Sequence, residues 1–426
     1  MIGNVKLQMK SLTKDQKVNT NLMLLLAGRM VSDLGTSIKM AVMPLYIIDI
    51  GGSAATIGIY SFFLLIPALV VFPFAGVLGD RYNRKTIMVM TDFGCGATML
   101  SLAFLANAGL LSLPLLFLAQ IIISTLNGLF DPATKGIVPQ LVQSDKLSRA
   151  NSSIAALRTL SGIAGPVLGV ILYTALGIKT LFIINGMAFI LSGLSETLIR
   201  YVHRKRQVKA RFITDMLDGF SFVSHKKLIR KLCFFLLCTY AMIMPLFSVA
   251  LPLFFRTELR YPDTQYGILQ SILVAGALIG SILAGVLFGK GSKETKGIIT
   301  GLFLMMAATL GFSALLFPQS LNLLGRETAL YFCVFAGIIS LLYVSIMFIH
   351  IPIQTIIQKE TPASHMSRVF SIVGMITRGG LPIGALIYGL LLEELAVHQV
   401  VLASTCLLLI ISLLFLSFLR QQGKMT

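Results

Sequence analysis

The sequence is short of charged residues, and most of those it has are basic. Only 12% of its 426 residues are Asp, Glu, Lys or Arg, whereas 56% are hydrophobic. A soluble protein carries about twice this charged fraction, so the composition excludes an ordinary soluble domain. Lys and Arg number 35 against 17 Asp and Glu, for a formal net charge of +18. Such an excess can indicate nucleic-acid binding, so the positions of the charges matter.

The sequence also lacks the patterns of disulfide, metal and nucleotide sites. Its five cysteines stand singly within apolar runs, as small core residues do. The five histidines are scattered, without metal-ligand spacing. The Gly-x-x-x-x-Gly-Lys and His-Glu-x-x-His motifs are both missing. These absences argue against a metalloenzyme and an ATP-driven pump, and we expect no cofactor and no enzymatic activity.

Apolar runs long enough to cross a bilayer recur along the chain. A membrane helix needs about 20 apolar residues, and the runs are continuous rather than alternating as in a β-barrel. The sequence therefore predicts an all-α membrane protein whose even number of spans places both termini on one side. The twelve predicted spans are 21–46, 56–79, 86–108, 114–139, 150–176, 180–199, 232–255, 266–289, 297–317, 329–356, 369–392 and 398–419.

The basic residues mark one face of the membrane. Most of them lie at the two termini and in the loops that share their side. The positive-inside rule therefore places both termini in the cytoplasm of a cell-membrane protein. The basic excess is then a signal of topology, with anionic lipid as a further contact, and nucleic acid is not expected as a partner. The exceptions in loops on the other side are Lys179, Arg256, Arg260 and Arg326.

The chain contains two similar halves joined by a polar linker. Ala75-Gly76-Val77-Leu78, at the end of the second span, recurs as Ala284-Gly285-Val286-Leu287 at the end of the eighth. Parallel six-span halves are typical of transporters that rock about a site near the midplane. We predict an N-terminal bundle over 1–199, a cytoplasmic linker with a short amphipathic helix over 200–231, and a C-terminal bundle over 232–426.

The loop between the second and third spans resembles a known signature. Its sequence is Gly76-x-x-x-Asp80-Arg81-x-Asn83-Arg84-Lys85. It is similar to the loop signature of the major facilitator superfamily, with Asn83 where the second glycine is usual. The resemblance implies two pseudo-symmetric six-helix bundles around a central cavity that opens alternately to each side.

Motifs in the fifth span and elsewhere narrow the resemblance. Gly165-Pro166-x-x-Gly169 is similar to the antiporter motif of the superfamily, with Val170 where its last glycine is usual. Further motifs resemble the branch that holds macrolide efflux proteins and the enterobactin exporter. They are Phe130-Asp-Pro132-Ala133, Pro139-x-Leu141-Val142, Leu147-x-x-Ala150-Asn151, Asp218-Gly219-Phe220, Pro352-x-x-Thr355-x-x-Gln358 and Ser367-Arg368-Val369-Phe370-Ser371.

This resemblance implies what the protein transports and how. It implies a secondary active exporter of drug-like or amphipathic small molecules, driven by the proton gradient and working as a monomer. One position departs from the pattern, because relatives often carry an arginine at the place of Ile123. The resemblance implies that this arginine helps proton coupling, so Ile123 argues against a proton-antiport mechanism of that kind.

The charged loop is expected to form a cytoplasmic gate. The resemblance implies that Gly76 packs against span eleven and that Asp80 faces the start of that span, where the helix dipole favours an anion. Arg84 has two candidate acidic partners, Asp131 and Asp145. Such contacts would favour the outward-facing state. The alternative is a solvated basic loop, of which Arg81 and Lys85 would also form part.

Charges within the spans are costly and therefore candidate functional groups. Arg29 and Asp33 are four residues apart on the first span and share a helix face. Asp33 lies roughly 18 Å from the start of its span at 1.5 Å per residue, about mid-membrane. It is either a protonatable coupling group or counter-ion of a cationic substrate, or the permanent partner of Arg29 or Arg158.

Arg158 and Arg378 occupy equivalent places in spans five and eleven. Two facing arginines can hold a carboxylate or phosphate, or they can act as gate residues paired with Asp33, Asp92 or Glu196. Polar side chains on span four either line the cavity or bond neighbouring helices, and the second role is favoured. They are Gln120 and Asn127.

Two rival functions remain open. One is a lysophospholipid or glycolipid translocator of the same fold, in which Arg158 and Arg378 would hold the phosphate. The other is a membrane sensor or scaffold that binds without transporting, with the basic linker as its partner surface. The loop signature argues against the second.

Overall fold

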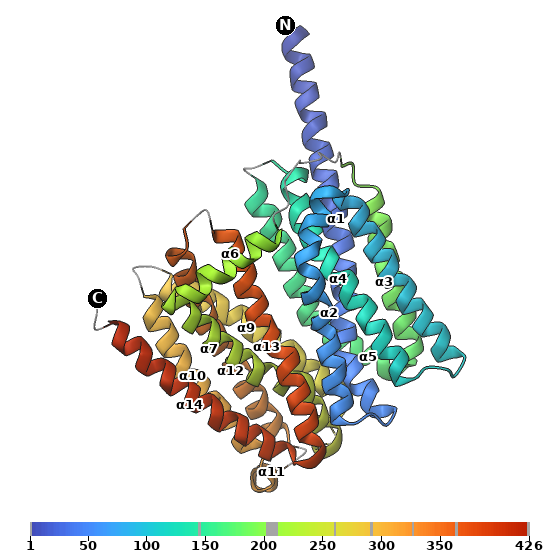
Figure 1. Cartoon of the computed structure of the whole chain (residues 1–426). Coiled ribbons are helices and arrows are strands. Elements are labelled where there is room, and N and C mark those ends of the chain that lie inside the picture. Colours follow the sequence, from blue (N-terminus) through green and yellow to red (C-terminus); the bar gives the residue numbers. More distant parts are fainter. Residues whose placement is uncertain are drawn as a thin grey trace. The chain divides into compact units, whose positions relative to one another are not determined.

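The computed structural model describes residues 2–143, 146–201, 212–259, 261–289, 293–325, 328–362 and 365–423. Within these ranges every regular element is a helix (Figure 1). The predicted all-α membrane fold is therefore confirmed.

The first half consists of five long helices. The third of them begins at a side-chain cap, because the Asn83 side chain accepts a hydrogen bond from the Lys85 backbone N–H at 3.0 Å and so satisfies an otherwise free donor. The helices are α1 (Ile2–Asp49), α2 (Ala54–Arg81), α3 (Arg84–Asn107), α4 (Leu113–Leu141) and α5 (Leu147–Thr197).

Helix α5 is long enough for two membrane crossings. Its 51 residues would extend about 76 Å at 1.5 Å per residue, against about 30 Å for a hydrocarbon core. Gly177 interrupts it with φ 73° and ψ 172°, a backbone conformation that glycine adopts without a steric cost. The predicted spans 150–176 and 180–199 thus meet at Gly177.

The second half contains the remaining helices. They are α6 (Phe212–His225), α7 (Lys227–Pro245), η2 (Leu246–Ala250), α8 (Leu251–Phe254), η3 (Phe255–Leu259), α9 (Asp263–Phe288), α10 (Glu294–Leu315), α11 (Pro318–Leu324), α12 (Ala329–Glu360), α13 (Met366–Glu394) and α14 (Val397–Gly423). The elements η2 and η3 are single π-helical turns. Pro245 and Pro252 lie beside them and lack the N–H that a regular α-helical ladder requires.

Eleven helices of the described ranges are long and apolar enough to cross a membrane. Their mean hydropathy over the most apolar window reaches 2.7 in Val397–Leu419. Because α5 supplies two crossings as one helix, this set is consistent with the twelve predicted spans. The helix α6 is the short helix that lies within the predicted linker.

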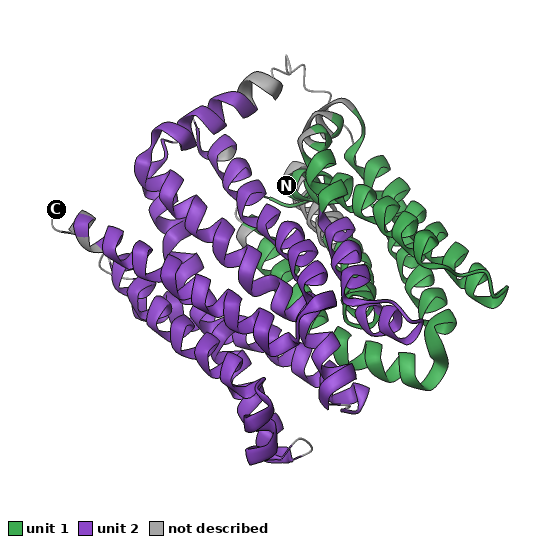
Figure 2. Cartoon of the chain, turned by 60° about the horizontal axis from the view of Figure 1, so that its bottom comes forward, with its two compact units in different colours: residues 1–42, 66–210 green, residues 43–65, 211–426 purple. Residues whose placement is uncertain are grey.

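The chain divides into two compact units (Figure 2). Unit 1 comprises residues 1–42 and 66–210, and unit 2 comprises residues 43–65 and 211–426. Unit 2 thus includes the hairpin formed by the end of α1 and the beginning of α2. The predicted bundles and linker stay a prediction.

Small residues allow close helix packing within unit 2. Helix α9 approaches α12 at Gly276 and Gly280. A Cβ added at Gly276 would lie 3.0 Å from the Ser340 carbonyl oxygen, and one at Gly280 would lie 2.7 Å from Val344 Cα. The absence of a side chain therefore sets the distance between the two backbones.

Two glycines of α9 give a matched test of this packing. We expect Gly280→Ala to cost about 1–3 kcal/mol, because the new methyl group meets backbone that cannot move aside. Gly285→Ala should be neutral or stabilising by up to about 1 kcal/mol, because nothing lies within 4 Å of its Cβ position and alanine is the better helix former. Thermal unfolding in detergent measures both, and equal melting temperatures would contradict the packing.

Candidate functional site

A buried ion cluster in unit 1 forms around Arg29. Arg29 and Asp33 are one helical turn apart on α1, and Arg29 Nη2 lies 3.2 Å from Asp33 Oδ1. Its Nη1 lies 3.9 Å from Oδ1 of Asp131 on α4. The guanidinium carbon is 5.0 Å from the centroid of the Phe130 ring, within cation–π distance. The structure thus brings together three of the predicted site residues.

The Arg29 cluster is incompletely satisfied. Arg29 Nε and Asp33 Oδ2 are buried and have no hydrogen-bond partner. A buried polar atom without a partner costs free energy, so both atoms could bind a further partner. The free Asp33 oxygen is therefore the candidate position for a proton or a cationic group.

The equivalent arginines lie in different units. Arg158 of α5 is exposed, and its charge acts on the Asp33 carboxylate. Arg378 of α13 is also exposed, and its charge acts on the Tyr240 hydroxyl within unit 2. Their predicted approach to each other stays a prediction. Asn127 of α4 is half-buried.

A second buried cation, Lys39 of α1, lies against α4. Its Nζ donates a hydrogen bond to Gln120 Oε1 at 2.9 Å, and both side chains are at most 3% exposed. The structure thus shows Gln120 bonding between helices, which was the favoured of its two predicted roles. Lys39 was not among the predicted site residues, because a partner on a distant helix leaves no local signal in sequence.

The start of α3 is fastened to two helices of unit 1. Arg84 Nη1 donates to the Gly136 carbonyl of α4, and Lys85 Nζ donates to the Thr197 carbonyl at 2.7 Å. The expected acidic partner of Arg84 was Asp131 or Asp145, but Asp131 lies beside Arg29. Gly136 explains the contact, because a Cβ there would lie 2.5 Å from the Arg84 guanidinium.

Part of the predicted gate falls outside what the structure describes. Asp145 lies outside the described residues, as do the side chains of Asp80 and Arg81 and the surroundings of Gly76. Their roles stay predictions.

The antiporter-type motif packs α5 against α1. A Cβ at Gly165 would lie 2.4 Å from Ser37 Cβ, and one at Gly169 would lie 3.0 Å from Ile38 Cα. Pro166 between them is buried. The motif thus holds α5 close to the helix that carries Arg29.

Two further carboxyl groups are buried between α3 and α5. Asp92 is 3% exposed and Glu196 is 1% exposed. Asp92 Oδ2 and both carboxyl oxygens of Glu196 have no hydrogen-bond partner. The sequence suggested them only as partners for the arginines, since a pairing across distant helices leaves no local signal.

An ion cluster at one end of unit 2 was not predicted. Arg256 of η3 donates through Nη2 to Asp49 Oδ1 at 2.7 Å, and its Nη1 pairs with Asp263 at the start of α9. Nearby, the Ala55 backbone N–H donates to Glu393 Oε1 at 2.8 Å. These contacts fasten residues 43–65 to the rest of unit 2.

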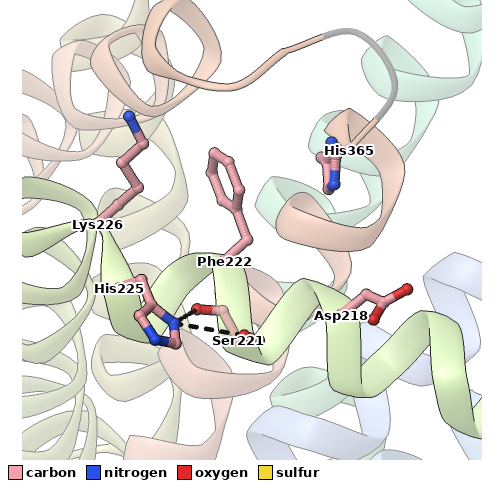
Figure 3. Close-up of a pocket in the computed structure, with 6 residues that line it drawn as sticks. All are labelled: Asp218, Ser221, Phe222, His225, Lys226 and His365. Atoms are coloured by element: carbon pink, nitrogen blue, oxygen red, sulfur yellow. Dashed lines mark hydrogen bonds between the residues drawn. The ribbon is translucent and has the colours of Figure 1, made fainter.

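A cavity of about 590 Å³ lies beside α6, at the start of α13 (Figure 3). Its wall includes the His365 ring, which stacks on Phe222 with centroids 5.3 Å apart. The His225 Nδ1 lies 2.7 Å from the Ser221 carbonyl oxygen. Asp218 at its far side is paired with Arg368 at 3.5 Å. The cavity is open and lies far along the chain from the Arg29 cluster.

The family model of the Major Facilitator Superfamily matches residues 25–378. The chain belongs to this superfamily. It is therefore a multi-pass membrane transporter, as the loop and span-five motifs implied. The matched range includes every residue of the Arg29 cluster.

Curated relatives are transporters of low identity that span nearly the whole chain. Macrolide efflux protein A of Streptococcus pyogenes is 25% identical over 391 residues, which cover 91% of this chain and 93% of the relative. Multidrug efflux pump Tap of Mycolicibacterium fortuitum is 25% identical over 415 residues, with 94% and 96% covered. The predicted resemblance to macrolide and multidrug efflux proteins is confirmed.

Solved structures show the same fold. The nucleoside transporter NupG superposes with a TM-score of 0.72 at 14% identity and covers 94% of this chain and 98% of its own. A bacterial homologue of the iron transporter ferroportin, in an inward-facing state, gives 0.68 at 18% identity with 92% and 98% covered. At these identities the likeness concerns the fold alone.

The buried Lys39–Gln120 contact can be tested by a double-mutant cycle. We expect Gln120→Leu to destabilise the protein by about 1–3 kcal/mol, because it leaves a buried ammonium unpaired. Adding Lys39→Met should recover part of this loss, since neither group then needs a partner. Thermal unfolding of the two single variants and the double variant measures the coupling. Additive losses would show that the two side chains do not interact.

Proposed function

We propose that this transporter exports drug-like or amphipathic small molecules by alternating access, coupled to the entry of protons. It works as a monomer in the cell membrane. Membership of the superfamily supports transport, and the Arg29–Asp33–Asp131 cluster is the observation that supports coupling. The two relatives described above support the substrate class, because their names state macrolide and multidrug efflux.

The orientation is proposed from charge. Lys85 of α3, Lys359 of α12 and Arg368 of α13 lie at helix ends that face the predicted cytoplasmic side. We call these ends, in each unit, the basic end. The positive-inside rule places such ends in the cytoplasm, so both termini are cytoplasmic in this proposal. Export then carries substrate from the basic end of the helices to the opposite end.

Coupling is assigned to the free oxygen of Asp33. When Asp33 is ionised, it compensates Arg29 and leaves that arginine held between two carboxylates. When Asp33 binds a proton, Arg29 keeps only the longer contact to Asp131 at 3.9 Å and becomes free to shift. If a proton and a cationic substrate occupy this Asp33 oxygen in turn, proton entry and substrate export are linked.

The position of Ile123 is compatible with this assignment. Ile123 on α4 is 1% exposed and belongs to the packed core. The arginine that relatives often carry there is missing, but α1 supplies Arg29 within the same unit. We propose that Arg29 provides the positive charge that regulates the coupling carboxylate.

A susceptibility panel tests the proposed substrate class. Expression in a host that lacks its own efflux pumps should raise the inhibitory concentration of macrolides several-fold. The protein should also drive pH-gradient-dependent erythromycin transport in proteoliposomes. Unchanged susceptibility to every drug together with no flux of erythromycin would reject export of this class.

Asp33→Asn tests the coupling role. We expect the variant to lose nearly all uphill transport and its dependence on external pH, because an amide cannot exchange a proton. Downhill exchange of erythromycin should persist. The matched control is Glu394→Gln, an equivalent change at an exposed carboxylate of α13, which should behave as wild type. An Asp33→Asn variant with the wild-type rate and pH profile would contradict the assignment.

A further inference from the structure

Helices α3 and the second part of α5 run antiparallel in unit 1. Lys85 at the start of α3 bonds the Thr197 carbonyl at the end of α5. Lys179, near the middle of α5, bonds the Asn107 side chain at the end of α3. This register places the helix segment around Asp92 beside the segment that ends at Glu196.

The same register brings two carboxyl groups to one location. A Cβ at Gly193 would lie 3.5 Å from Asp92 Cβ, and Glu196 follows Gly193 by less than one helical turn. On the neighbouring helix, a Cβ at Gly28 would lie 3.1 Å from Ser192 Oγ. Arg29 is therefore the next residue of α1 at this point. The acidic pair lies where α1, α3 and α5 meet.

Most of the carboxyl oxygens of this pair have no hydrogen-bond partner. Asp92 is 3% exposed and Glu196 is 1% exposed. Three of their four carboxyl oxygens are buried without a hydrogen bond. The buried Ser192 hydroxyl lies beside Asp92 and acts on its carboxyl group. Arg29, the cation nearest along α1, makes its ion pairs with Asp33 and Asp131.

Burial of this kind is incompatible with two ionised carboxylates. An isolated charge in a low-dielectric interior is so costly that the group binds a proton instead, and two neighbouring carboxylates cannot both ionise. A pair of this kind takes up and releases protons as a unit. The lack of hydrogen bonds leaves the oxygens free to do so.

We propose that Asp92 and Glu196 form a second proton-binding site, through which protons pass between Asp33 and the basic end of unit 1. The charged groups outside the pair that act on it come from α1. Arg29 and Asp33 act on Asp92, and Arg29 also acts on Glu196. At the basic end of unit 1, Glu196 precedes Thr197 in the chain. The Thr197 carbonyl accepts the hydrogen bond from Lys85.

The passage consists of proton transfers only. A proton leaves a carboxyl oxygen of Asp33 and binds a carboxylate oxygen of the pair, and the pair then releases a proton toward the basic end. Asp33 becomes an anion beside Arg29, while the pair returns to its earlier charge. No bond other than O–H bonds forms or breaks. Chains of buried acidic groups serve as proton relays in membrane pumps.

Infrared spectroscopy of the purified full-length protein tests the site without substrate. Wild-type protein should show a protonated carboxyl carbonyl band that shifts in D2O. This band should be reduced in Glu196→Gln and in Asp92→Asn, and unchanged in the control Glu394→Gln. If one variant fails to fold, the other decides. A band that is missing in wild type, or unchanged in both variants, would overturn the site.

Passage is tested separately, and this part rests on the proposed proton coupling. In proteoliposomes with a pH-sensitive dye inside, we expect erythromycin-coupled proton movement to fall about a hundredfold in Glu196→Gln, the lower end of what a positioned proton-transfer group contributes. Erythromycin binding should be retained. Wild-type proton movement in that variant would overturn the passage. If wild type itself couples no protons, the proposed coupling fails, while the infrared result still decides whether the pair binds a proton.

Discussion

The free-energy cost of an unpaired charge in an apolar interior determines which side chains pair in unit 1. Each intramembrane cation of α1 has found a partner on α4, because the alternative is an exposed charge in hydrocarbon. Lys39 takes a neutral amide, and Arg29 takes Asp131 together with Asp33. The packing of α1 against α4 therefore depends on these contacts as much as on apolar surface. The carboxyl groups that form no ion pair are the ones whose protonation we propose to change.

Charge and aromatic surface are distributed unequally between the units. The buried ion cluster described above belongs to unit 1. In unit 2, rings gather around α7 and α12, where Phe247 and Tyr343 lie 5.0 Å apart and Tyr240 and His350 lie 6.0 Å apart. Such rings can bind the apolar body of a bulky ligand. In the proposed mechanism, the proton-binding group belongs to unit 1 and this aromatic cluster belongs to unit 2.

The sequence predicted what depends on local pattern and missed what depends on register between distant helices. Apolar runs predicted the spans, and motifs predicted the family. The contact of Arg84 with the Gly136 carbonyl was not predicted, because a backbone carbonyl has no signature in sequence. The pairing of Asp92 with Glu196 depends on how α3 lies along α5. The π-helical turns beside Pro245 and Pro252 were hidden because proline also occurs in regular membrane helices.

Gly177 has a consequence for how the transporter can be altered. Two crossings join there without an intervening loop, since helical residues precede and follow this one glycine. An inserted epitope or reporter at this turn would lie directly between two helical segments, with no loop residues to absorb it. The connection from α10 to α12 is different, because it already contains the separate short helix Pro318–Leu324, which ends at its C-cap Gly325 with φ 79°. Tolerance to insertion therefore differs between two turns of one chain, and labelling studies should begin at the second.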